Sequence, residues 1–212
     1  CRARESLIKE RSKFAVLLTN ELDKSFPELK PFFNNMISST LLYILEKYTN
    51  TKHIASMKDY DSIRKISYGK FTYAKFAKLK ELAKNSVGFH NENTDLLIST
   101  YVSIYNDFNN KIDPIEKQIS TIIKVLNPRM LTIPGIGEIS AATILSEYGD
   151  IKNFSSPNKM LAFAGLDPSI NQSGTLESNG KMVKHGSGHL RYAIMNSAMT
   201  ILRFSPEFYD YY

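Results

Sequence analysis

The stretch from Asn93 to Leu126 constrains the fold most, because apolar residues recur along it at alternating steps of three and four positions. This periodicity places them on one face of a helix and is typical of a coiled-coil seam. The seam consists of Leu97, Tyr101, Ile104, Phe108, Ile112, Ile115, Ile119, Ile122 and Leu126. We therefore expect a long coiled-coil-like helix over residues 93–127. Its apolar face would either pack within its own domain or dimerise.

A proline interrupts this pattern, since Pro114 follows Asp113 in the middle of the seam. Proline has no backbone N–H, and its ring clashes with the preceding turn of a helix. The sequence therefore predicts a kink at Pro114, or two helices that meet at residues 112–114.

The preceding residues 1–92 also show helical periodicity and are expected to form a helical linker region. Helices are predicted near residues 4–25, 35–48, 54–66 and 71–85. The last of these is rich in lysine, a pattern that indicates a solvated surface more often than a phosphate-binding track. No segment of the chain shows convincing alternation of period two, so the predicted fold class is all-α.

Composition and charge favour a nucleic-acid partner. The 212 residues carry a formal net charge of +6, which attracts anionic molecules. The single cysteine, Cys1, excludes an intrachain disulfide and a cysteine-based zinc site. His185 and His189 lack the acidic residue that would complete a metalloprotease motif, so no cofactor is expected for this chain. No apolar run is long enough to span a membrane, and no membrane partner is expected.

The run from Leu131 to Gly149 predicts a helix-hairpin-helix, in which two helices flank the sequence IPGIG. Glycine adopts backbone conformations closed to other residues, and the free N–H groups at the start of the second helix favour a phosphate. The expected nucleic-acid contacts of this hairpin are Pro134, Gly135, Ile136 and Gly137. The alternative is a tight turn whose glycines serve geometry only.

A short helix and a long polar loop follow the hairpin. Ser155 or Ser156 is expected to cap the helix, and Gly165 to end it. The loop runs over residues 165–191, and Ser187 is expected to cap the final helix. Its predicted phosphate contacts are Lys181, Lys184, His185 and Arg191. A serine hydroxyl in this setting is chemically able to attack a DNA phosphate, although serine beside glycine is usually just a turn.

Together these blocks resemble the C-terminal part of the bacterial insertion-sequence transposases that include the Piv DNA invertase, the "IS one-ten" family. The matching features are the IPGIG sequence, the run Ala164–Pro168, the Gln172–Gly174 block and Lys184-x-Gly186 followed by Leu190-Arg191. The resemblance implies that residues 128–212 form a C-terminal transposase domain containing the hairpin and the serine loop.

The resemblance implies that Ser173 is the nucleophile of DNA strand exchange. Members often carry a serine where this chain has Val183, which leaves Ser173 as the favoured residue. It also implies an N-terminal RNase H-like domain that binds divalent metal, expected to be Mg²⁺. We expect that domain to be missing here, and the chain to be inactive alone. The implied partners are DNA, a structured guide RNA and further copies of the chain in a homodimer or higher oligomer, in the bacterial cytoplasm.

Two other classes of function stay open at this point. One is a non-catalytic, structure-specific DNA-binding module built on the helix-hairpin-helix. The other is a coiled-coil dimerisation protein whose basic charge is incidental.

Overall fold

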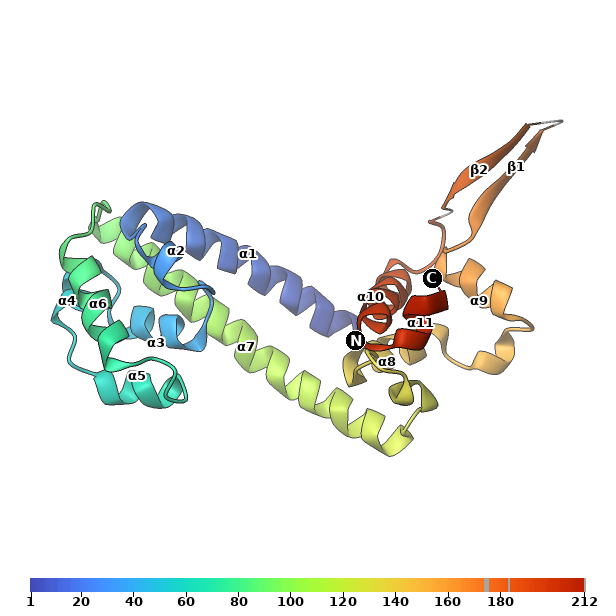
Figure 1. Cartoon of the computed structure of the whole chain (residues 1–212), viewed down its shortest axis with the longest axis horizontal. Coiled ribbons are helices and arrows are strands. Elements are labelled where there is room, and N and C mark those ends of the chain that lie inside the picture. Colours follow the sequence, from blue (N-terminus) through green and yellow to red (C-terminus); the bar gives the residue numbers. More distant parts are fainter. Residues whose placement is uncertain (174–175, 183, 212) are drawn as a thin grey trace. The chain divides into compact units, whose positions relative to one another are not determined.

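The computed structural model describes residues 1–173, 176–182 and 184–211, and leaves out the side chains of residues 168–181. The chain divides into two compact units. One is Ser6–Ile112, and the other combines Cys1–Glu5 with Asp113–Tyr212. The two longest helices, α1 (Arg2–Ser25) and α7 (Glu92–Leu126), contribute residues to both units (Figure 1).

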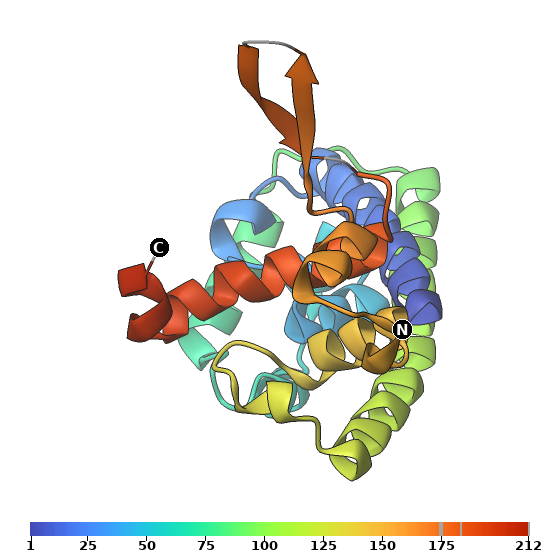
Figure 2. The same cartoon turned by 90° about the vertical axis from the view of Figure 1, so that its right-hand side faces the viewer.

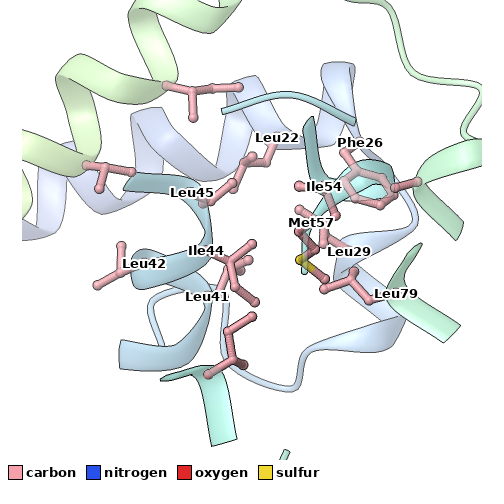
Figure 3. Close-up of a cluster of buried hydrophobic side chains, with 14 of the residues drawn as sticks. Leu22, Phe26, Leu29, Leu41, Leu42, Ile44, Leu45, Ile54, Met57 and Leu79 are labelled. Atoms are coloured by element: carbon pink, nitrogen blue, oxygen red, sulfur yellow. The ribbon is translucent and has the colours of Figure 1, made fainter. Parts of the chain in front are cut away.

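The unit Ser6–Ile112 is a bundle of helices around an aliphatic core. Besides its parts of α1 and α7 it contains α2 (Leu29–Phe32), α3 (Ser39–Lys47), α4 (Thr51–Ser56), α5 (Tyr60–Ile66) and α6 (Tyr73–Lys84). Leu22, Leu41, Ile44 and Leu79 are fully buried where these helices meet (Figure 3). Burying each such side chain contributes about 1.5–3 kcal/mol, so this core provides the main stabilisation of the unit.

Side-chain caps fix where several of these helices begin. Ser38, Asn50 and Thr72 each accept a hydrogen bond from a backbone N–H three residues further on. Such caps satisfy N–H groups that have no partner within the helix. The predicted helix over 54–66 is wrong as a single element, because α4 and α5 are separated at residues 57–59, where Met57 turns into the core.

Within this unit, α1 packs against α7. The ring of Phe14 lies 6.2 Å from that of Tyr101 and 5.9 Å from that of Phe108, measured between centroids. The guanidinium of Arg11 donates to the side-chain oxygen of Asn109 at 2.7 Å. In this unit the apolar face of α7 therefore packs inside its own domain. A coiled coil and a dimer through α7 stay predictions.

Pro114 lies inside α7, which runs as one helix of 35 residues. The predicted alternative of two separate helices is therefore wrong. Proline removes one backbone hydrogen bond, and the bonds on either side hold a helix of this length together.

The second unit has a core made mostly of small side chains. After α7 it contains the 3₁₀ helix η1 (Arg129–Thr132), α8 (Glu138–Tyr148), η2 (Ile151–Asn153), α9 (Pro157–Ala164), β1 (Pro168–Ser173), β2 (Leu176–Met182), α10 (Gly188–Phe204) and α11 (Pro206–Tyr211). Its buried residues are mostly small, with Ala141, Ala164 and Ala193 beside Leu190. Small side chains let α8, α9 and α10 approach one another closely.

The strands β1 and β2 form an antiparallel hairpin where the sequence predicted a loop. The all-α prediction is thus correct for the helical part of the chain and wrong for this segment. The strands read PSINQS and LESNGKM, and neither alternates apolar with polar residues. Because the sequences of these strands lack that alternation, periodicity could not reveal them.

None of the helices that the structure describes is long and apolar enough to cross a membrane.

Candidate nucleic-acid interface

The predicted helix-hairpin-helix is present in part. Its second helix, α8, begins at Glu138 with Gly137 as the N-cap residue. The element before the turn is the short 3₁₀ helix η1, because α7 already ends at Leu126. A hydrogen bond of 3.1 Å from the N–H of Ile136 to the carbonyl of Ile133 closes the turn. The helix-hairpin-helix geometry is therefore not confirmed.

The two glycines of the turn have different surroundings. Gly135 has a φ of +95°, and a Cβ there would lie 3.0 Å from the backbone of Thr200 and Ile201 in α10. Glycine is required at position 135 because of this backbone conformation and the close packing on α10. This is the purely geometric role named above as the alternative to phosphate binding. Gly137 has an ordinary φ of −87°, and a Cβ there would meet nothing within 4 Å.

Only part of the turn is open to a phosphate. Pro134, Gly135 and Gly137 are exposed, whereas Ile136 is half-buried. The first N–H groups of α8 have no intrahelical acceptor, and the helix dipole favours an anion beside them. The carboxylate of Glu138 lies in the same first turn, 3.8 Å from the ammonium of Lys124. This acidic group weakens the local attraction for a phosphate.

Ser173 and Lys181 lie near opposite ends of the β-hairpin. Ser173 is the last residue of β1 and is in register with Leu176, whereas Pro168 pairs with Met182 at the base. Leu176 and Lys181 are five positions apart, which corresponds to roughly 17 Å of strand. The hairpin extends away from the helices of its unit (Figure 2). Ser173 is thus carried at the end remote from those helices, and the hairpin does not bring the two residues together.

The connection from β2 to α10 carries two more predicted contacts, Lys184 and His185, and both are exposed. The next residue, Gly186, is packed against the end of α9. A Cβ on Gly186 would lie 2.0 Å from the carbonyl oxygen of Phe163 and 2.5 Å from the nitrogen of Gly165. Gly186 is therefore held against the end of α9 by a close backbone approach, and the two cations that precede it lie at the surface.

Arg191 has a structural partner. It is half-buried in the first turns of α10, and its Nη1 donates to the carbonyl oxygen of Ala164 at 3.2 Å. That carbonyl is at the C-terminal end of α9, where cations are favoured by the helix dipole. Arg191 thus ties α10 to α9, and this contact occupies one of its donors.

A carboxylate that sequence reasoning missed, Glu147 of α8, organises the start of α10. Its side chain is only 5% exposed and accepts two hydrogen bonds from Arg2, at 2.7 and 2.8 Å. Ser187 donates to it at 2.7 Å. The bonds from Arg2, together with that from Ser187, lower the pKa of Glu147 to about 2. Because Arg2 lies 145 positions away, no local pattern could have indicated this pair.

The predicted caps of the last helices are confirmed. The hydroxyl of Ser187 accepts from the N–H of Leu190 at 3.2 Å and so caps α10. Ser156 caps α9, with Pro157 in its first turn and Gly165 ending it at a φ of +68°.

No group of three or more His, Cys, Asp and Glu side chains suited to a metal ion occurs among the described residues. One member of the histidine pair, His189, instead lies against the carboxylate of Glu5, with Nδ1 and Oε2 2.6 Å apart. The binding of Mg²⁺ by an N-terminal domain therefore stays a prediction.

Comparison with known proteins shows what the C-terminal part of the chain is similar to. Residues 127–212 match the sequence profile of a family described as the transposase IS116/IS110/IS902 family. A 43.6 kDa uncharacterized protein of insertion element IS110 from Streptomyces coelicolor is 26% identical over 120 residues, covering 56% of this chain and 30% of that protein.

Two further relatives have more specific names. The transposase for insertion sequence element IS1111A of Coxiella burnetii is 28% identical over 124 residues, covering 58% of this chain and 34% of that protein. The pilin gene-inverting protein of Moraxella bovis is 31% identical over 116 residues, covering 49% of this chain and 36% of that protein. The matches thus span about one third of the length of these relatives. The C-terminal portion of this chain, residues 127–212, is therefore similar to transposases of the IS116/IS110/IS902 family.

Proposed function

We propose that this chain is the C-terminal part of a DNA transposase that binds nucleic acid and supplies Ser173 as the nucleophile for strand exchange. The observation that carries the proposal is the family match of residues 127–212, which includes the whole β-hairpin. The position of Ser173 at the remote end of that hairpin supports it. A serine held there can reach a phosphate without the helices of the unit colliding with the duplex.

The chemistry is a phosphoryl transfer. The Oγ of Ser173 attacks a DNA phosphorus, an Oγ–P bond forms, and the P–O bond to one strand end breaks. The serine proton leaves to a base, and the departing oxygen takes up a proton to become a hydroxyl. Attack by the hydroxyl of a new strand reverses these steps and releases Ser173, so the phosphodiester bond energy is conserved.

The surrounding residues divide between binding and support. Lys184 and His185 are exposed beside the base of the hairpin and would contact the DNA backbone. Gly137 and the start of α8 offer N–H donors to a further phosphate. Arg191 and Glu147 hold the start of α10, from which the hairpin connection departs.

Divalent metal enters this proposal only through the N-terminal domain that the family resemblance implies. The described residues of this chain offer no site for the expected Mg²⁺, so no step above is routed through a metal. The same proposal includes an RNase H-like domain that holds the Mg²⁺ and a structured guide RNA. It also includes assembly as a homodimer or higher oligomer.

A chimera tests the role of Ser173. The chain is joined to an intact N-terminal domain from a family member, and recombination between two marked DNA sites is measured for wild type and Ser173→Ala. Ser169→Ala, in the same strand, is the matched control. We expect Ser173→Ala to abolish recombination and Ser169→Ala to leave it within about twofold of wild type. Unchanged recombination with Ser173→Ala would remove the serine from this role.

The second candidate function is a non-catalytic module that binds structured DNA. The open space above Gly137 favours it, because a DNA backbone could approach the N–H groups there. This function predicts salt-sensitive binding to duplex or junction DNA that is weakened by Gly137→Val and unaffected by Ser173→Ala.

A third candidate function is a dimerisation protein whose basic charge is incidental. It predicts a dimer in solution that does not bind DNA or RNA at low salt.

A further inference from the structure

The turn between α5 and α6 and the adjoining parts of these two helices, in the unit Ser6–Ile112, form a segment rich in cations. From Ser62 to Lys80 the sequence contains no Asp or Glu. The cations of this stretch are Arg64, Lys65, Lys70, Lys75, Lys78 and Lys80, and all except Lys80 are exposed. The structure describes this unit completely, and none of the six takes part in its ion pairs. The uncompensated charge attracts a polyanion.

Two exposed tyrosines, Tyr68 and Tyr73, lie between these cations in the sequence. Tyr73 is 65% exposed, and its ring packs edge-on against Tyr60, with centroids 5.3 Å apart, and beside Phe76, at 6.1 Å. Its position is therefore fixed by aromatic neighbours while much of its surface faces water. Tyr68 is 92% exposed. Water thus surrounds a large apolar ring that contributes little to the core.

The backbone that presents Tyr68 is unusual and well fixed. The N–H of Tyr68 donates to the carbonyl of Lys65 at 3.1 Å, and that of Gly69 donates to Arg64 at 2.9 Å. Tyr68 has a φ of +51°, in the left-handed region that a bulky side chain rarely adopts. A glycine would occupy this helix end without strain. Strained residues gather at functional sites, and the strain here holds a tyrosine in solvent.

We propose that the α5–α6 turn binds single-stranded nucleic acid, with an unpaired base stacked on Tyr68 and Tyr73 as a second stacking platform. Arg64, Lys65 and Lys70 would contact the flanking phosphates. An exposed ring among cations fits a single strand better than a duplex, because the faces of paired bases are covered by their neighbours. The site lies outside residues 127–212, so it does not rest on the proposed strand exchange. RNA and DNA share this chemistry, and the experiment separates them.

Photocrosslinking of the whole chain tests the site. Single strands of about 10 nucleotides carrying 5-iodouracil are prepared as RNA and as DNA, with a duplex DNA of the same sequence for comparison. Trypsin cuts after Lys65 and Lys70 and so releases Ile66–Lys70, in which Tyr68 is the only aromatic residue. We expect an adduct on this peptide with RNA, with DNA or with both, and none with the duplex. Phe89, 70% exposed in the same unit, is expected to stay unmodified.

A pair of double variants tests the cations without touching the tyrosine. Arg64→Gln/Lys75→Gln keeps the tryptic peptide and removes two exposed cations, and it should lower the yield of the Tyr68 adduct at least about threefold. Lys13→Gln/Lys24→Gln removes two lysines that are already paired with Glu10 and Glu21, and should leave the yield unchanged. No adduct on Ile66–Lys70, an equal adduct with the duplex, or equal losses in the two double variants would each overturn the proposal. These outcomes do not depend on Ser173, so the strand-exchange proposal stands or falls separately.

Discussion

Gly186→Ala should disrupt the packing of the segment before α10 against the end of α9. The added Cβ would lie 2.0 Å from the carbonyl oxygen of Phe163, 2.5 Å from the nitrogen of Gly165 and 2.6 Å from the carbon of Ala164. All three are backbone atoms, so no side chain can rotate aside, and the connection has to move by about 1 Å to reach ordinary contact. Overpacking of this kind costs about 3 kcal/mol.

The expected effect is large for a unit of this size. A loss of about 3 kcal/mol lowers the Tm of a domain of roughly 100 residues by about 12–20 °C. The matched control is Gly188→Ala, two positions along the chain, where the nearest atom to the new Cβ is the Nη2 of Arg191 at 3.7 Å. Because Gly188 begins α10, alanine there should leave the Tm unchanged or raise it slightly.

Hydrogen exchange, followed peptide by peptide during thermal unfolding, measures the loss of stability in the unit that contains Gly186. The informative peptides are those of α9 and α10. Exchange in α3 and α6 serves as the internal reference, because they belong to Ser6–Ile112. If Gly186→Ala exchanged like Gly188→Ala at every temperature, the close approach of the connection to α9 would be wrong.

Two further results are expected. The pKa of Glu147 is held at about 2 against an ordinary value of 4.5, so its contribution to stability is complete above about pH 4.5 and is lost as the pH falls toward 2. Glu147→Gln should lower the free energy of unfolding by about 1 kcal/mol at pH 7. When the Tm is measured as a function of pH, the curves of the wild type and the variant should converge between pH 4.5 and 2. Parallel curves would contradict the assigned role of Arg2. Gly135→Ala should destabilise the unit by about 1–3 kcal/mol, because Gly135 has a positive φ and packs on α10. Gly137→Ala should change stability by no more than about 1 kcal/mol and weaken duplex binding instead. Thermal unfolding and fluorescence anisotropy on the same two variants separate these effects, and the reverse assignment would place the phosphate site at Gly135.

The helical part of the fold was predictable because its cause is local. The apolar spacing along α1, α3, α6 and α7 is visible in the sequence, and helix formation follows from it. The caps at Ser156 and Ser187 were predictable for the same reason, since a capping side chain acts on an N–H only a few residues away.

The features that escaped prediction depend on distant residues or on the absence of a pattern. The strands β1 and β2 are polar, so no alternation revealed them. Gly135 faces the backbone of Thr200 and Ile201, and Arg2 reaches Glu147; neither contact leaves a trace in the neighbouring sequence. Arg191 was predicted as a phosphate contact on its charge alone, and its bond to Ala164 became visible only in the folded unit.

The covalent state of Ser173 during strand exchange tests the proposed function most directly. The chimera is mixed with a DNA site that carries a nick beside the exchange position, which lets a strand end diffuse away after cleavage and traps the intermediate. Trypsin then releases Met160–Lys181, and fragmentation of this peptide distinguishes Ser173 from Ser169 and Ser178. We expect a nucleotide on Ser173 alone, absent in Ser173→Ala. A nucleotide on another residue, or continued recombination with no adduct on this peptide, would contradict the assignment of Ser173 as the nucleophile.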